Sequence, residues 1–141
     1  MTRVRPSSLR RAFLWLPPLV YAALIFHFSS ETDPMPGLTR AVWDKALHSV
    51  EYAGLALLLC RACRGEGGGW LASCAFAFIV ACAYALSDEW HQAFVPGRDS
   101  NPRDWLADAT GGWIGVVFYW FAASRRWLRT LGREPTRYEH G

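Results

Sequence analysis

Four long apolar segments restrict what this chain can fold into more than any other feature of its sequence. They cover roughly residues 12–28, 46–60, 70–87 and 105–123. A helix needs about 20 mostly apolar residues, or about 17 at the short end, to cross the ~30 Å hydrocarbon layer of a membrane. The first, third and fourth segments meet this requirement directly. The second meets it only if its helix begins near Ala41 and carries several charged residues into the membrane interface.

These segments are predicted to form a single domain. The chain has 141 residues, of which 52% are hydrophobic, and that share is heavy for a water-soluble fold of this size. No small-x-small cleavage site follows the first segment, so we predict a retained helix rather than a signal peptide. We therefore predict an all-α integral membrane bundle of four transmembrane helices across residues 12–123, between a basic N-terminus at 1–11 and a basic tail at 124–141.

The basic residues predict how this bundle is oriented. The N-terminus, the turn at 61–69 and the tail together hold eleven Lys and Arg, whereas the two other loops and the helix ends beside them hold four. Cytoplasmic segments of membrane proteins carry the excess of Lys and Arg. We therefore predict a multi-pass protein of the cell membrane with both termini in the cytoplasm. Most of the acidic residues then lie on the outer side.

Ionisable residues continue the face of each helix that packing is expected to turn inward, at about 100° per residue. These faces contain Asp44, His48 and Glu51 in the second helix, Tyr84, Asp88 and His91 in the third if it persists that far, and Asp104, Asp108, Gly111 and Gly115 in the fourth. A charge at the bilayer centre costs about 2.5 to 3.5 kcal/mol on insertion scales, so such groups face the bundle interior or water. We therefore expect the three faces to converge on one polar pocket under the outer loops.

Local signals add two details. Asn101 is predicted to cap the fourth helix, with Pro102 at its first position. In the third helix Ser73, Ala77, Ala81 and Ala85 recur every four residues, a spacing that lets membrane helices approach closely.

The same charged residues also have a purely structural interpretation. Asp44 could pair with Lys45, and Asp104 could pair with Arg98 or Arg103. Such ion pairs would only hold helix ends together. For a single residue this interpretation stands beside the functional one. It explains less well why acids align with the small-residue faces of three helices.

Several of these residues together resemble the VanZ-like membrane protein family. The resemblance is carried by Asp44-Lys45-x-x-His48-x-x-x-Tyr52, by Glu89-x-x-Gln92 leading into Phe94-x-Pro96-x-Arg98, and by Asp104-x-x-x-Asp108-x-x-Gly111. It covers about residues 44–115. Asp108 stands where the resemblance leads us to expect Asn in many relatives. The resemblance implies a role in the bacterial envelope, because the family's namesake is linked to resistance against teicoplanin, a glycopeptide antibiotic with a lipid tail. It implies no settled reaction.

Two classes of function stay open. The first is a pocket that binds a lipid-linked or lipidated headgroup at the outer leaflet, with Arg98 and Lys45 as cationic donors, since the planar fork of Arg suits a phosphate. The second is an enzyme that modifies such a lipid, with Glu89 or Asp88 as general base and His48 or His91 as proton carrier. The predicted ligand-binding residues are Asp44, Lys45, His48, Tyr52, Asp88, Glu89, Gln92, Arg98, Asp104 and Asp108. A purely structural or partner-binding bundle is the third alternative.

The expected partner is a membrane lipid or a lipid-linked cell-wall intermediate. We expect no nucleic acid, because positive-inside topology already explains the basic tail. Gly111 and Gly115 could serve a homo-oligomer or a contact inside the monomer. We predict no cofactor and no metal. The two pairs of ligand types on one helix face, His48-x-x-Glu51 and Asp88-x-x-His91, have a spacing that is common by chance, and no HExxH run is present.

Overall fold

The computed structural model describes residues 7–32, 44–98 and 100–131, and for Asp44 and residues 126–131 it describes the backbone alone. Within these ranges the regular structure is entirely helical. The helices are α1 (Ser8–Ser29), α3 (Asp44–Gly65), α4 (Trp70–Gln92) and α5 (Pro102–Leu131). The prediction of an all-α fold is therefore confirmed for the described residues. The predicted helix start near Ala41 lies outside them.

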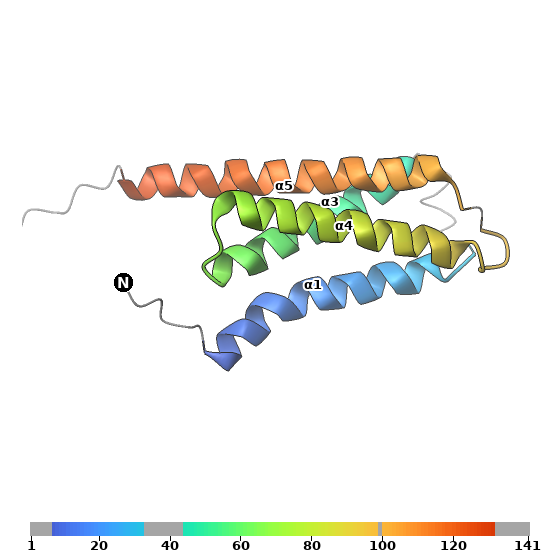
Figure 1. Cartoon of the computed structure of the whole chain (residues 1–141), viewed down its shortest axis with the longest axis horizontal. Coiled ribbons are helices and arrows are strands. Elements are labelled where there is room, and N and C mark those ends of the chain that lie inside the picture. Colours follow the sequence, from blue (N-terminus) through green and yellow to red (C-terminus); the bar gives the residue numbers. More distant parts are fainter. Residues whose placement is uncertain (1–6, 33–43, 99, 132–141) are drawn as a thin grey trace, which may run out of the picture.

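The four helices alternate in direction and form an elongated bundle (Figure 1). The start of α1, the turn between α3 and α4, and the end of α5 lie at one end of the bundle. The end of α1, the start of α3 and the loop between α4 and α5 lie at the other end. This arrangement brings the polar parts of the sequence at 44–52 and 88–108 to the same end.

Three of the described helices are long and apolar enough to cross a membrane. They are Ser8–Ser29, Lys45–Gly65 and Trp70–Gln92. The second apolar segment of the sequence thus qualifies from Lys45 onward, without the extension to Ala41. Helix α5 is not among the three, although its 30 residues make it the longest. Its apolar run is interrupted by Asp108, Thr110 and three glycines, which lower its hydropathy.

Helix boundaries follow the local signals. Helix α4 continues through His91 to Gln92, as the pocket prediction required. Helix α5 begins at Pro102, and the Asn101 side-chain oxygen accepts a hydrogen bond from the Arg103 amide at 3.0 Å. The predicted cap is therefore present.

Small residues allow the helices to pack closely. Ser73, Ala77, Ala81 and Ala85 are all buried, so the small-residue face of α4 does turn inward. Gly111 and Gly115 of α5 lie directly against the backbone of α3 at Ser49 and Ala53. The glycine face therefore serves the internal contact, one of its two predicted uses. A homo-oligomer remains a prediction and would need another surface.

Candidate functional site

The centre of the site is a buried pair of side chains from α3 and α5. The Nδ1 atom of His48 lies 3.1 Å from the Oδ1 atom of Asp108. The side chain of His48 is 10% exposed and that of Asp108 is fully buried. The contact exists because α3 and α5 touch along their small-residue faces, one turn from Gly111. Helix packing thus turns two residues 60 positions apart into neighbours.

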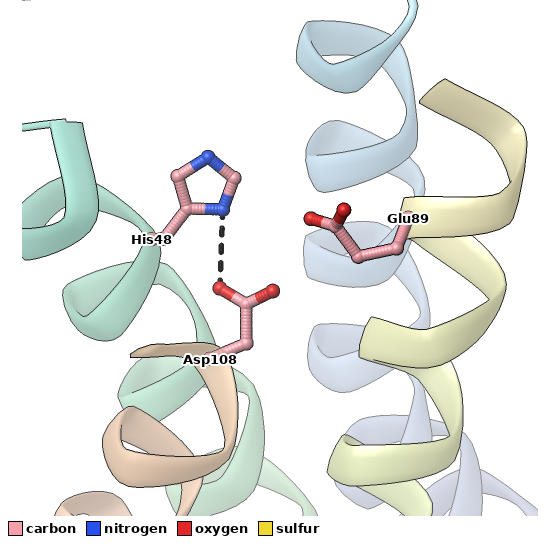
Figure 2. Close-up of side chains that lie close together, drawn as sticks. All are labelled: His48, Glu89 and Asp108. Atoms are coloured by element: carbon pink, nitrogen blue, oxygen red, sulfur yellow. Dashed lines mark hydrogen bonds and ion pairs between the residues drawn. The ribbon is translucent and has the colours of Figure 1, made fainter. Parts of the chain in front are cut away.

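Glu89 completes this centre from α4, and its carboxylate points toward the other two side chains (Figure 2). One ligand-type atom from each of His48, Glu89 and Asp108 lies within 4.8 Å of the other two, and all three residues are buried. We call these three residues the acid–histidine cluster. The Oε2 atom of Glu89 accepts hydrogen bonds from the Asn101 amide at 2.9 Å and from the Ser100 hydroxyl at 3.3 Å. The loop that precedes α5 therefore orients this carboxylate.

Two carboxylate oxygens of the cluster keep their hydrogen-bonding capacity. The Oε1 atom of Glu89 and the Oδ2 atom of Asp108 are buried and make no hydrogen bond to the described residues. A buried acceptor without a donor costs free energy, about 1–3 kcal/mol and more for a charged group. Native proteins keep few such atoms, and they concentrate at functional sites. These oxygens mark the cluster as a place where a bound group would be stabilised.

A second polar group extends the site toward α1. The amide of Gln92 donates to Asp88 Oδ2 at 3.3 Å and to the Ser29 hydroxyl at 3.0 Å. Asp88 and Gln92 are both buried, and Tyr52 is fully buried. The Tyr52 hydroxyl lies near the buried Asp88 carboxylate, which can accept a hydrogen bond from it. The predicted residues Tyr52, Asp88 and Gln92 therefore do face the bundle interior.

The two cations predicted to bind an anionic headgroup are engaged outside the cluster. Lys45 forms an ion pair with Asp104, and both side chains are partly exposed. Arg98 donates from Nε to the Glu31 carbonyl at 2.9 Å and from its terminal nitrogen to the Phe28 carbonyl at 3.1 Å. Arg98 thus caps backbone carbonyls at and just after the end of α1, where the Phe28 carbonyl also accepts from the Glu31 amide at 3.2 Å.

The ion pair of Asp104 differs from the pairs suggested by the sequence. Its partner is Lys45 rather than Arg98 or Arg103. The reason is the register of α3 against α5. Lys45 precedes His48 by about one turn, and Asp104 precedes Asp108 by about one turn, so the contact between His48 and Asp108 also brings the other two together. Of Asp44 only the backbone is described, so its predicted role lies outside the described side chains.

His91 lies away from the cluster. Its Nε2 atom is 3.0 Å from the Ser30 hydroxyl, and its ring stacks on Phe26 at a centroid distance of 4.5 Å. Both contacts are with the end of α1. Of the two histidines considered as proton carriers, His48 is therefore the one that meets carboxylates from other helices.

Sequence reasoning left several residues out of the site. Ser100 and Asn101 orient Glu89, and Ser29 holds Gln92. Glu51 is half-buried and within electrostatic range of His48, Asp88 and Asp108. Glu51 was predicted on the same inward face of α3 as His48, although not among the ligand-binding residues. The roles of the other three could not be predicted, because they depend on contacts between elements far apart in the chain.

A cavity gives access to Glu89 from the side of the bundle. It has a volume of about 440 Å³ and lies between the ends of α4 and α5. Its lining consists of Leu86, Glu89, Trp90, Ser100, Pro102 and Trp105. Trp90 and Leu86 are 71% and 61% exposed, so the cavity opens on the outer face of the helices. A molecule that enters here meets aromatic rings first and the carboxylate of Glu89 behind them.

Further along the same two helices lies a second cavity, which we call the α4–α5 groove. It has a volume of about 570 Å³ and is almost wholly apolar. Its lining includes Leu71, Ala75, Ile79, Trp113, Val117 and Trp120. Together the two cavities place the side chain of Glu89 and a long apolar groove along the same two helices.

Comparison with known proteins yields one match. The VanZ/LLP1 family model matches residues 5–123. Neither the curated proteins nor the solved structures contain a match to this chain. The family match covers α1, α3 and α4 entirely and most of α5, and it includes every residue of the acid–histidine cluster.

Proposed function

Because this chain belongs to the VanZ-like family of membrane proteins, we propose that it binds the headgroup of a lipid-linked or lipidated molecule in the bacterial cell envelope. The observation that carries the proposal is the acid–histidine cluster, which has buried carboxylate oxygens without donors and one member, Glu89, that lines a cavity opening between exposed side chains of α4 and α5. Teicoplanin, with its lipid tail, is the ligand class that the family's namesake suggests.

The chemistry of the site favours a headgroup that donates hydrogen bonds. The cluster and its surroundings offer oxygens of Glu89, Asp108 and Asp88 as acceptors. The nearby cations Lys45 and Arg98 already have partners. Hydroxyl and amino groups, as in sugars, would therefore satisfy the cluster directly. Ionisable groups at membrane depth that face the bundle interior are a functional-site hypothesis by default.

The α4–α5 groove supplies the place for the lipid tail. It lies along the same two helices as the cavity beside Glu89. Ile79 in the groove is seven residues, about two turns, from Leu86 in that cavity, and Trp113 is eight residues from Trp105. Its almost wholly apolar and aromatic lining matches an acyl chain. A tail lying there would keep the headgroup at the cavity beside Glu89.

Filling this groove is expected to weaken the binding of lipidated ligands. Ala75→Trp places a large ring in the groove, so teicoplanin should bind about 3-fold to 10-fold more weakly, since packing rather than transfer from water holds a chain between membrane helices. The same variant should bind a glycopeptide without a lipid tail as well as the unaltered protein does. Calorimetric titration of the detergent-solubilised protein measures both affinities.

Ala72→Trp is the matched control, because Ala72 is an exposed alanine one turn away on α4 and does not line the groove. It should leave both affinities unchanged. Equal effects of the two variants on teicoplanin would contradict a tail-binding role for the groove.

We also infer that α5 crosses the membrane. With four spans both ends of the chain lie on the same side, and the excess of Lys and Arg on that side predicts that it is the cytoplasm. Helix α5 is about 45 Å long at 1.5 Å per residue, and its polar and small residues Asp108, Gly111 and Gly115 face inward. Its exposed side chains include Trp113, Ile114, Phe118 and Phe121, which suit lipid. Inward-facing residues thus account for its lower hydropathy.

Cysteine labelling of cells tests this orientation in a cysteine-free background. Phe94→Cys, in the exposed loop after α4, should react with a membrane-impermeant maleimide in intact cells. Gly69→Cys, where a side chain meets no neighbour, should react only after permeabilisation. The opposite pattern would place the acid–histidine cluster at the cytoplasmic side and end the proposal of an outer-leaflet ligand.

A membrane-embedded enzyme is the second candidate. The observation that favours it is the buried contact between His48 and Asp108, since a carboxylate that orients an imidazole is a common arrangement in acid–base catalysis. In this case Glu89 or His48 would exchange a proton with the bound headgroup. Asp88, which bonds to Gln92, lies further from the histidine contact and would position the ligand.

A further inference from the structure

We propose that His48, Glu89 and Asp108 bind one divalent cation, which holds an anionic oxygen of the headgroup. The proposal rests on the proposed function, because it concerns the same site. It replaces direct hydrogen bonds from the headgroup to the cluster with a cation that holds an anionic group, a phosphate or carboxylate. It reverses the expectation drawn from the sequence. That expectation considered pairs of ligand types on one helix, whereas the three side chains come from α3, α4 and α5.

The charge of the site is the first argument. Glu89 and Asp108 are 5% and 1% exposed, and Asp88 beside them is 4% exposed. Moving a carboxylate out of water costs several kcal/mol unless an opposite charge accompanies it. The described cations nearby are committed elsewhere, Lys45 to Asp104 and Arg98 to carbonyl oxygens of α1. A bound divalent cation would balance the two carboxylates of the cluster.

The geometry is the second argument. The three ligand-type atoms lie within 4.8 Å of one another. Two ligand atoms that each lie about 2.1 Å from one tetrahedral ion are about 3.4 Å apart, so the most widely spaced pair would have to close by up to about 1.4 Å, a shift that side-chain rotations can supply. Glu89 and Asp108 each retain one buried oxygen without a hydrogen bond to the described residues, and the Glu89 carboxylate points toward Asp108 and His48 (Figure 2). Coordination would satisfy these atoms.

The ligand set indicates which ions fit. One imidazole and two carboxylates combine a nitrogen donor, which suits zinc and other transition metals, with hard oxygen donors, which suit manganese and magnesium. Zn²⁺ and Mn²⁺ accept both kinds of ligand. Three protein ligands leave at least one position of a tetrahedral ion open. Glu89 is the member of the cluster that lines the cavity, so an oxygen of the headgroup would approach that position past the Glu89 side chain.

Hydrogen bonds to the Glu89 carboxylate support this arrangement. Metal-bound carboxylates are usually held by hydrogen bonds of their own. Glu89 has such bonds from the Asn101 amide and the Ser100 hydroxyl, both to Oε2, which leaves the buried Oε1 atom available as a ligand. The loop before α5 thus fixes the carboxylate in a position from which it can bind an ion.

The experiment measures metal binding without any lipid. The full chain is purified in detergent, stripped with a chelator, and titrated with Mn²⁺ alone, followed by electron paramagnetic resonance, and with Zn²⁺ alone, followed by calorimetry. We expect one ion per chain and a rise of several degrees in the thermal unfolding midpoint on adding the metal. His48→Ala and Glu89→Gln should each weaken binding at least about 10-fold, because each removes a ligand.

Two exposed residues supply matched controls. His27→Ala and Glu31→Gln make the same changes at side chains that are 64% and 49% exposed at the end of α1. They should leave the stoichiometry and affinity unchanged. If the unaltered protein binds less than one ion per chain at millimolar metal, or if His48→Ala binds as tightly, the cation site is wrong. Because the number of bound ions is measured on the unaltered protein, that measurement tests the cation site even where a variant fails to fold.

A separate measurement distinguishes this inference from the proposed function. Binding of teicoplanin and of an anionic phospholipid is compared in chelator-treated and metal-loaded protein. Metal-dependent binding of the anionic lipid supports the cation site. Equal ligand binding with and without metal overturns the proposed role of the ion in holding the headgroup and leaves the headgroup pocket intact. Metal binding without any ligand binding overturns the proposed function and its headgroup class while leaving the ion itself in place.

Discussion

Replacing Glu89 with glutamine is expected to weaken headgroup binding by about 10-fold to 150-fold, since a hydrogen bond to a charged group contributes about 1.5 to 3 kcal/mol. Glutamine is similar in size but carries no charge, and its amide nitrogen cannot accept. It can keep a bond from Asn101 through its oxygen. The atom corresponding to Oε1, which is buried and faces the cluster, then becomes a donor rather than an acceptor. Calorimetric titration with teicoplanin measures the change, and protein levels in the membrane report on folding.

Glu31→Gln is the control for this prediction, because Glu31 is exposed and lies outside the cluster. It should bind teicoplanin normally. The variant at Glu89 also separates the two candidate functions. A binding pocket predicts weaker binding, whereas an enzyme predicts preserved binding together with the loss of a lipid modification, read by mass spectrometry of extracted envelope lipids. Normal binding and unaltered lipids would exclude Glu89 from both roles.

Gly111→Ala is expected to destabilise the bundle by about 1 to 3 kcal/mol, the usual cost of overfilling a packed core. A methyl group there would overlap the carbonyl oxygen of Ser49, and the Cα and carbonyl carbon of Ser49 lie close behind it. Backbone atoms of a helix cannot move aside, so α5 must separate from α3. Because Ser49 follows His48 and Gly111 lies one turn from Asp108, this separation also pulls apart the His48–Asp108 contact. Ligand binding should fall with stability.

The neighbouring glycine provides a sharp comparison. A methyl group on Gly112 would meet Ala81 Cβ at 3.5 Å, which is ordinary van der Waals contact. Alanine is also the better helix former by about 1 kcal/mol, so Gly112→Ala should be neutral or stabilising. Thermal unfolding in detergent should show the midpoint of the Gly111 variant falling by about 4 to 10 °C and that of the Gly112 variant unchanged or higher. Similar midpoints for the two variants would contradict the close contact between α3 and α5.

Much of the site follows from periodicity within single helices. His48 on α3, Asp88 on α4 and Asp108 on α5 all face inward, as their spacing relative to small residues predicts. Tyr52 and Gln92, which the family resemblance included, face inward as well. Small residues indicate where another helix packs, and acids near helix ends avoid lipid. These are properties of one helix in a membrane, so one sequence suffices to infer them.

Pairing between helices was harder to predict. Asp104 could reach several cations by sequence distance, and only the register of α3 against α5 selects Lys45. Arg98 was expected to face a ligand, yet it lies on the carbonyls of Phe28 and Glu31 because the end of α1 comes beneath the loop after α4. Such choices depend on how neighbouring helices are rotated and shifted, which no single periodic pattern contains.

The sequence by itself determined the helical class, the inward faces, the cap at Asn101 and the family. The tertiary structure alone decided that His48, Glu89 and Asp108 meet, and that Lys45 and Arg98 do not join them. The physical reason is the range of the forces involved. Apolar length and helical period act within about twenty neighbouring residues, whereas a buried cluster from three helices requires the contact of Gly111 with Ser49, which joins parts of the chain about sixty residues apart.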